Sequence, residues 1–416
     1  MSRKQMSFRN TRRAALAVAL VGAVIAMPAV SQQGKSPKTQ LWLDVGTHSM
    51  PGMPSMTGMG GAAMRMFGGD SMQNNYGSAR HSGLPGKYVD IALLNQLNPG
   101  KEAEDLIPAG MQLGKSLPLI PPKAEVKQDL GGSTRGMADG NAKARILIYW
   151  GCSPTVRPGQ PKEIKFEVKN GKVTGNTAAW GNAMQGRYVP DRSAKVDPRY
   201  ALWPNEKLRK MVPKTGSLVG NHHIVGEKVP ASLQFDLTQQ QDFMPAIALA
   251  STGDLASGQT FNWKPVDRAQ GYFLHAMGTQ GDAMVFWSSS DIADAGMGIF
   301  DYLPPSTVDK WIREKVLLAP SVTSCAVPKG IFAGQEGGGG MLQMIAFGPE
   351  SNIAWPPKPT DPKVAWNPEW NVRVRNKSTA TAMLGMSLDA TQAEQRDEQQ
   401  PQENKAKRLL KGLLGR

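Results

Sequence analysis

Methionine side chains recur at close spacing in a glycine-rich stretch near the N-terminus, and thioethers are ligands for soft metal ions. His48 is followed by Met50, Met53, Met56 and Met59, so a thioether stands at every third residue. Thioether sulfur selects copper(I), and no other cofactor is indicated. The pattern predicts a copper site at these five residues. Two alternatives stay open: the methionines absorb oxidants, or they only fill a low-complexity loop.

Two cysteines, Cys152 and Cys325, offer thiol chemistry. In an oxidising compartment an even number of cysteines predicts a disulfide, here joining the middle of the chain to its late part. Two buried thiols, or a bridge between two molecules, are the alternatives.

Sequence motifs for catalysis are not found. The chain has no Gly-x-Ser-x-Gly, His-Glu-x-x-His or Cys-x-x-Cys motif. His222 and His223 are adjacent, and adjacent residues of a strand face opposite ways, which disfavours one shared metal ion. His275 is expected to be a packed histidine. We therefore assign no catalytic residue, and an enzyme of unrecognised type ranks third among the functions considered.

The C-terminal residues can form a short basic amphipathic helix. Its apolar face carries Leu409, Leu410, Leu413 and Leu414. Its other face carries Lys407, Arg408 and Lys411. Such a helix suits an anionic membrane surface or a groove on a partner. The sequence therefore predicts a docking tail that binds an unknown envelope protein or a membrane surface.

The N-terminal residues have the order of a secretory signal. Five basic residues and no acid occupy residues 1–13, an apolar run covers 14–26, and Ala29 and Ser31 are small residues suited to cleavage. The mature protein is expected to begin near Gln32 and to be periplasmic or secreted. The absence of a nearby cysteine argues against a lipoprotein, and the short apolar run against a membrane span. General secretion and twin-arginine export both stay open.

The net charge of +14 comes from the two ends of the chain. Five of the 48 basic residues lie in the first thirteen positions and five in the last thirteen, so the other 38 face 34 acids. A nearly balanced body does not form a phosphate-binding surface, and no nucleic-acid partner is expected.

Alternation of apolar and polar residues predicts a mainly β protein. The expected strands are 41–45, 89–93, 145–150, 163–169, 233–237, 245–251, 260–266, 271–278, 283–290, 322–327, 341–347 and 371–381. Both faces of 145–150 are apolar, which indicates a strand covered on both sides. One short helix is expected after Ser306, which is placed as its N-cap. No structure is assigned to 175–221.

Two strands resemble part of a known family. Phe261–Val266 contains Trp263, and Gly271–Leu274 contains Tyr272, which resembles the second and third strands of a fibronectin type III domain. The resemblance implies an immunoglobulin-like sandwich in which these two rings pack in one core. It implies no chemistry. On residues 117–122, 145–152 and 272–278, the whole chain also resembles uncharacterised exported proteins of Gram-negative bacteria.

These patterns predict two β-rich domains. The expected division is a signal at 1–31, a strand and Gly/Met-rich flexible segment at 32–86, an N-terminal β domain at 87–228, a type III-like sandwich at 229–384, a disordered linker at 385–403 and a tail at 404–416. The leading interpretation is a non-enzymatic envelope protein that binds or scaffolds. Periplasmic copper binding is the second.

Overall fold

The computed structural model describes the body of the chain and leaves out both ends. The described residues are 36–51, 74–81, 84–123, 142–169, 172–176, 187–190, 192–294, 296, 298–333, 339–361 and 363–388. They form mainly β structure with one short α-helix, as the sequence predicts. Within these ranges no helix is long and apolar enough to cross a membrane.

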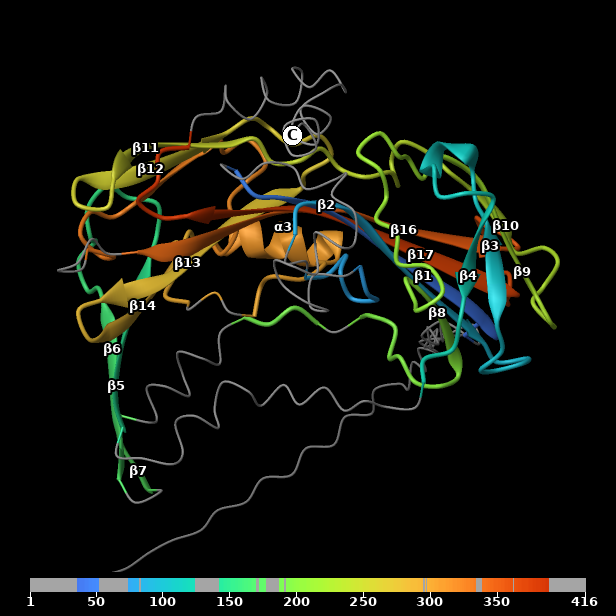
Figure 1. The fold of residues 1–416 in the computed structure, drawn as a ribbon, viewed down its shortest axis with the longest axis horizontal. Coiled ribbons are helices and arrows are strands. Elements are labelled where there is room, and N and C mark those ends of the chain that lie inside the picture. The colour runs from blue at the N-terminus through green and yellow to red at the C-terminus, as the bar shows by residue number, and fades with distance from the viewer. Residues whose placement is uncertain are drawn as a thin grey trace, which may run out of the picture.

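One sheet of ten strands runs through the whole molecule (Figure 1). In spatial order its strands are β7 (Lys172–Gly175), β6 (Lys162–Lys169), β5 (Ala142–Trp150), β14 (Ala283–Ser288), β13 (Gly271–Gln280), β16 (Gly340–Trp355), β17 (Trp370–Met383), β1 (Thr39–Ser49), β2 (Gly86–Asn95) and β8 (Tyr200–Trp203). Two of the pairings are parallel, β1 with β17 and β14 with β5. The first strand of the chain therefore lies beside the last.

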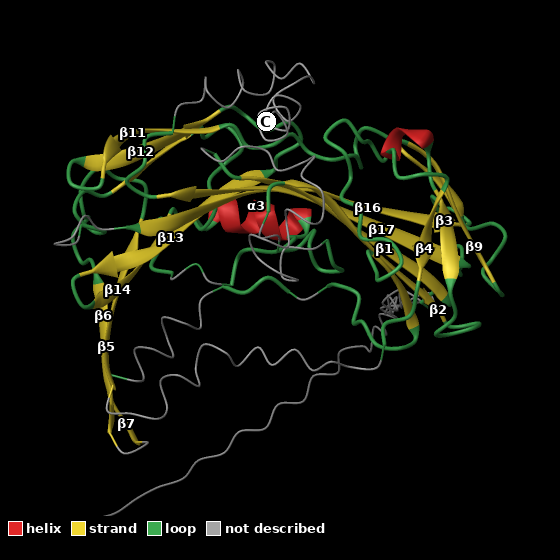
Figure 2. Cartoon of the chain, viewed as in Figure 1, coloured by secondary structure: helices red, strands yellow, loops and turns green. Residues whose placement is uncertain are grey.

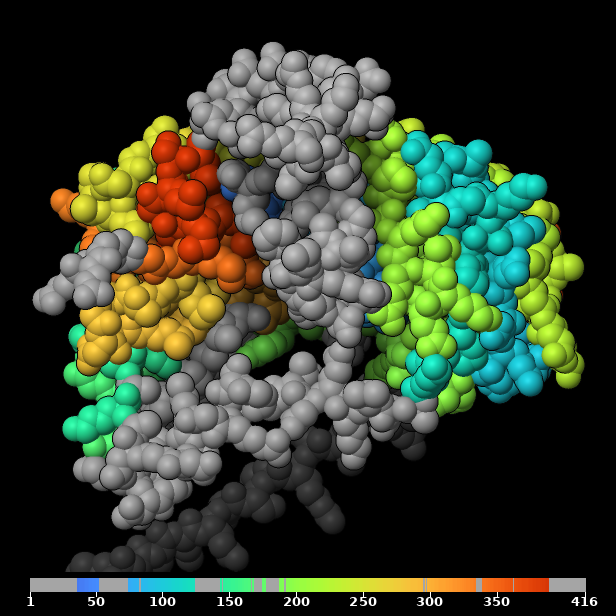
Figure 3. Space-filling model, in the orientation of Figure 1, coloured from blue at the N-terminus to red at the C-terminus, as the bar shows by residue number. Residues whose placement is uncertain are grey.

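Two small sheets cover one face of this long sheet, one toward each end (Figure 2). The first contains β10 (Gln234–Leu237), β9 (Gly220–Gly226), β3 (Ala103–Leu106) and β4 (Ser116–Leu119). The second contains β11 (Leu249–Asp254), β12 (Gly258–Trp263) and β15 (Ser324–Val327). In the space-filling view the two covers lie at opposite ends of the molecule, and we call these ends its two lobes (Figure 3).

Each cover encloses its own hydrophobic core, and β17 contributes to both. Val372 and Val374 pack in the core under β3, β4, β9 and β10. Ala380 and Ala382 pack in the core under β11, β12 and β15. All four are even-numbered residues of one strand, so they share a face. The remaining face of β17 carries the charged side chains described below.

Strands on either side of residue 229, the expected start of the second β domain, pair with strands from the other side. β5, β6 and β7 precede this position, yet β5 pairs with β14 of the C-terminal half. β10 follows it, yet pairs with β9 of the N-terminal half. The central position of β5 agrees with the double covering predicted for it, because Ile146, Leu147, Ile148 and Tyr149 are all buried.

The only α-helix of the described residues is α3 (Pro305–Arg313), which packs on the face of the long sheet opposite the two small sheets. A 3₁₀ turn, η2 (Ala109–Met111), follows β3. Val308 and Trp311 of α3 are buried, as its periodicity predicts. The predicted N-cap is wrong: Pro304 stands at the cap and Ser306 lies inside the helix. Proline suits this start because the first turn needs no donor from it.

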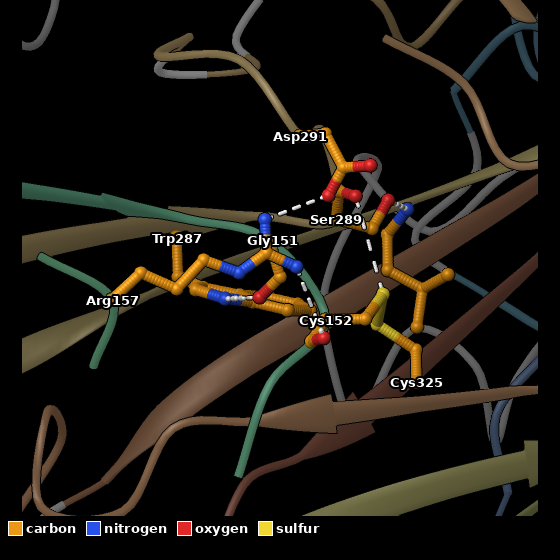
Figure 4. The surroundings of a disulfide bond; sticks show 8 residues. Gly151, Cys152, Arg157, Trp287, Ser289, Asp291 and Cys325 are labelled. Atoms are coloured by element: carbon orange, nitrogen blue, oxygen red, sulfur yellow. Dashed lines mark hydrogen bonds and ion pairs between the residues drawn. A yellow bond between two sulfur atoms is a disulfide. The ribbon is translucent and has the colours of Figure 1, made fainter. Parts of the chain in front are cut away.

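A disulfide joins the long sheet to the smaller cover. Cys152 lies directly after β5 and Cys325 lies in β15, and their sulfurs are 2.01 Å apart, which confirms the predicted bridge. Figure 4 shows its surroundings: Arg157 donates to the Cys152 carbonyl over 3.2 Å and pairs with Asp291 over 2.7 Å. The Trp287 indole donates to the Gly151 carbonyl over 3.2 Å. The main chain beside Cys152 is thus held from two sides.

We expect loss of this bridge to destabilise the fold strongly. It closes a loop with a sequence separation of 173 residues, so replacing both cysteines by serine should lower the free energy of unfolding by about 5 kcal/mol. Urea unfolding under non-reducing conditions measures the loss. Reductant should lower the midpoint of the parent protein and leave that of the double variant unchanged. Equal midpoints for parent and variant would contradict the prediction.

Candidate functional site

A cluster of buried charged side chains lies on the face of the long sheet that the small sheets leave free. We call Asp44, Asp90, Arg375 and Lys377 the charged cluster. They come from β1, β2 and β17, where Asp44 stands opposite both Asp90 and Arg375 in the strand register. Their exposed fractions are between 1% and 6%. Charged groups are buried at this depth only when other groups of the protein compensate them.

Arg375 and Asp44 form a two-pronged ion pair. The guanidinium Nε lies 2.7 Å from one carboxylate oxygen of Asp44, and Nη2 lies 2.5 Å from the other. Burial lowers the pKa of Arg375, but the charge of Asp44 and its hydrogen bonds outweigh this and raise the pKa above its ordinary value. Arg375 therefore keeps its charge, and β17 is joined to β1 by side chains as well as by the main chain.

Lys377 is the most deeply buried charge of the cluster. Its ammonium donates to the carbonyl of Arg80 over 2.6 Å and lies 4.5 Å from the centre of the Tyr302 ring, which also carries the Arg375 guanidinium at 4.6 Å. Burial lowers the pKa of Lys377 to about 8. Cation–π contacts of this kind are stronger where water is excluded. The aromatic ring of Tyr302 thus makes cation–π contacts with both Arg375 and Lys377.

Asp90 lies in surroundings that favour its neutral form over its charged form. Burial, followed by the neighbouring charge of Asp44, raises the pKa of Asp90 well above its usual range. The Arg375 guanidinium binds both carboxylate oxygens of Asp44, the residue that stands opposite Asp90. Asp90 accepts a hydrogen bond from the Ala79 amide over 3.0 Å.

The turn at residues 74–81 lies directly on the cluster. The Ala79 carbonyl accepts a hydrogen bond from the Tyr302 hydroxyl over 3.1 Å, and Arg80 pairs with Asp301 over 3.2 Å. Gly46 makes this approach possible, because a Cβ there would lie 2.5 Å from the Ala79 carbonyl oxygen. Contacts through the cluster therefore connect the turn and the 298–303 segment to the long sheet.

His48 belongs to this locked region rather than to an open ligand set. Its Nδ1 is 2.6 Å from the Thr379 hydroxyl, and its Nε2 is 3.1 Å from the Ser78 carbonyl. Burial, followed by the charge of Lys377, lowers the pKa of His48 to about 3. Both ring nitrogens are engaged, so His48 would have to leave these partners before it could bind copper.

The other predicted copper ligands are not brought together by the described residues. Met50 is half-buried just after β1. Met53, Met56 and Met59 lie outside the described residues, so the copper site at this segment stays a prediction. Among the residues described, no group of three or more His, Cys, Asp or Glu side chains could hold a metal ion.

His222 and His275 each have structural surroundings. His222 is buried, with Nδ1 3.1 Å from Asp105 and Nε2 3.0 Å from the Leu218 carbonyl. Burial lowers the pKa of His222, but the hydrogen bond to Asp105 outweighs it and raises the pKa. His275 packs against the rings of Phe286 and Phe300, as a packed histidine should.

The charged cluster connects β1, β2 and β17 to one another and to the 74–81 turn through electrostatic contacts. Ion pairs, hydrogen bonds and ring contacts compensate its charges within the protein, and the pKa values of Asp90, Arg375 and Lys377 are all shifted from their ordinary values. Sequence reasoning missed it. The available signal was that β1, β2 and β17 each place a charge on the face opposite their aliphatic residues, and that these charges include both signs.

Replacing the two opposed carboxyl groups should have unequal effects. Asp44→Asn leaves Arg375 buried without its counter-charge and should lower the free energy of unfolding by about 3–5 kcal/mol. Asp90→Asn, its matched control across the strand pair, replaces a group that is already neutral and should cost about 1 kcal/mol or less. Urea unfolding at neutral pH compares them. Equal losses would mean that the proton does not reside on Asp90.

His48 should make stability fall in acid. The pKa of the folded-state imidazole is about 3, below its value near 6.5 in an unfolded chain. Between these values only the unfolded chain takes up the proton, so stability decreases as pH falls from 6.5 toward 3. The contribution between pH 7 and pH 4 is about 3 kcal/mol.

Unfolding free energies of the parent and of His48→Gln across this range isolate the histidine. The variant should be less stable at pH 7 and should show a shallower decline in acid. Parallel pH profiles would contradict the assignment.

Comparison of the chain with protein-family models, with curated proteins and with solved structures found no match.

Proposed function

We propose that the chain is an exported, non-enzymatic protein of a bacterial cell envelope that binds a partner protein at the tip of the β16–β17 hairpin. The observation that carries this proposal is the exposure of two large apolar side chains there. Trp355 ends β16 and is 49% exposed, and Val364 in the connection to β17 is 53% exposed. Exposed aromatic and aliphatic groups on a fixed loop are the usual anchors of protein interfaces.

The connection is held in place by its own hydrogen bonds. The Trp366 indole donates to the Pro356 carbonyl over 2.9 Å, and the Glu369 amide donates to the Trp355 carbonyl over 2.6 Å. Trp370 is buried, and its indole donates to the Ser232 hydroxyl over 3.0 Å. A loop fixed in this way loses little conformational entropy on binding, which favours affinity.

The strands behind the tip form a rigid support. β16 pairs with β17 along nearly its whole length and with β13 over its first half. Both strands reach from one lobe to the other. A binding loop on such a frame is displayed at a fixed distance from the opposite end of the molecule, which suits a scaffolding role.

A fibronectin type III-like arrangement is our proposal for the C-terminal lobe. Three strands, β11, β12 and β15, enclose one core with β14, β13, β16 and β17, and β5 of the N-terminal half adds Leu147 and Tyr149 to it. Trp263 and Tyr272 pack across the core from opposite layers, with ring centres 5.5 Å apart. Both observations support the resemblance, and α3 then occupies the connection between β14 and β15.

Export and docking complete the proposal. The Cys152–Cys325 bridge supports an oxidising compartment, in line with the signal expected at residues 1–31. The basic tail at residues 404–416 lies outside the described residues, and we propose it as a second contact, with an envelope protein or an anionic membrane surface.

Photo-crosslinking in intact cells tests the tip. A photoreactive phenylalanine at position 364 should give an adduct of defined mass, while the same group at Leu97, which is 44% exposed in a turn after β2, should not. Trp355→Ala should abolish the adduct from position 364 and leave protein abundance unchanged. No adduct from position 364, or equal adducts from both positions, would overturn the proposed binding surface.

A further inference from the structure

Three methionines stand side by side across three neighbouring strands. Met277 of β13 is opposite Met341 of β16, and Met341 is opposite Met383 of β17. Residues opposite each other in a sheet point to the same face. The register therefore lines up three thioethers, which we call the methionine row, although they are separated by up to 106 positions in the sequence.

The neighbouring residues show on which face of the sheet the methionine row lies. Ala276, Leu342 and Ala382 precede or follow the three methionines, and all three are buried in the core on the covered side. The methionines must then point away from that core. Met277 is 39% exposed and Met383 is 53% exposed, and Met341 between them is partly exposed.

The spacing and flexibility of the three side chains allow them to share one ligand. The Cβ atoms of directly opposed residues are about 5 Å apart, and methionine has three flexible side-chain torsions. Three thioether sulfurs in a row can thus converge on one ion. Met284 of β14 adds a fourth thioether nearby, because it lies on the same face two residues from Phe286, the residue opposite Met277.

We propose that Met277, Met341 and Met383 form a binding site for a soft monovalent metal ion, copper(I). Neutral sulfur ligands favour such an ion over hard divalent cations, which prefer carboxylate oxygens. The row lies at the start of β16 and Trp355 lies at its end, roughly 45 Å away along the strand. The metal site is thus separate from the binding tip, and its three ligands are different residues from those predicted at 48–59.

Silver(I), a redox-stable ion of the same charge and softness, tests the site directly. The disulfide-bonded mature protein is labelled with carbon-13 in the methionine methyl groups and titrated with silver nitrate in chloride-free buffer. The methyl resonances of Met277, Met341 and Met383, assigned by single Leu substitutions, should shift together and saturate at one equivalent. The resonance of Met386, which is equally exposed beyond β17, should not follow them.

Substitutions separate this site from the N-terminal methionines. In a background with Met53, Met56 and Met59 changed to Leu, one equivalent of silver should still bind. Adding Met383→Leu should weaken that binding by about tenfold or more, whereas Met386→Leu should leave it unchanged. Copper(I) should give the same ranking in anaerobic competition with a chromogenic chelator.

Two results would overturn the site. One is that the three resonances stay fixed at silver excess. The other is that Met383→Leu and Met386→Leu weaken binding equally, which would indicate unspecific thioether contact. Leucine keeps the size and apolar character of methionine, so folding is retained, and an unchanged unfolding midpoint verifies it. Failure of the metal site would leave the crosslinking test of the tip unaffected, because the two sites share no residue.

Discussion

The pairing of the first strand with the last is the constraint on which the rest of the structure depends. β1 and β17 run parallel over eleven registered residue pairs, and the Asp44–Arg375 ion pair spans a separation of 331 residues within that register. Because β17 also contributes to both hydrophobic cores, its position fixes β16 and β13 on one side and β1 and β2 on the other. A buried ion pair adds specificity to such a pairing, since a shifted register would leave charges unpaired in a dry environment.

Most of the strands were predictable because their side chains alternate. The short helix and the disulfide were predictable for equally local reasons, from an apolar stripe at helical spacing and from an even cysteine count. Five strands are absent from the expected set. β3, β4, β7, β8 and β9 span only four to seven residues, and turn residues surround them. The second half of β16 was missed because Gly348, Pro349 and the polar run after them interrupt its pattern at a bulge.

The charged cluster and the methionine row were hidden for a different reason. Each joins residues whose sequence positions are far apart, and only the strand register brings them together. Asp44, Asp90, Arg375 and Lys377 look individually like the solvated side of half-exposed strands. Their burial depends on the turn at 74–81 and on Tyr302. The sequences of the three strands do not predict where these covering residues lie. The copper prediction considered the methionines that are close in sequence and overlooked those that are close in space.

Placing the last strand beside the first also has a consequence for biogenesis. Until β17 has been synthesised, β1 has an exposed hydrogen-bonding edge through more than 300 residues of growing chain. An open edge with buried-type side chains on it invites pairing with other chains. The pairing of β1 with β17 can therefore form only when synthesis is nearly complete, and until then this edge stays open to other chains.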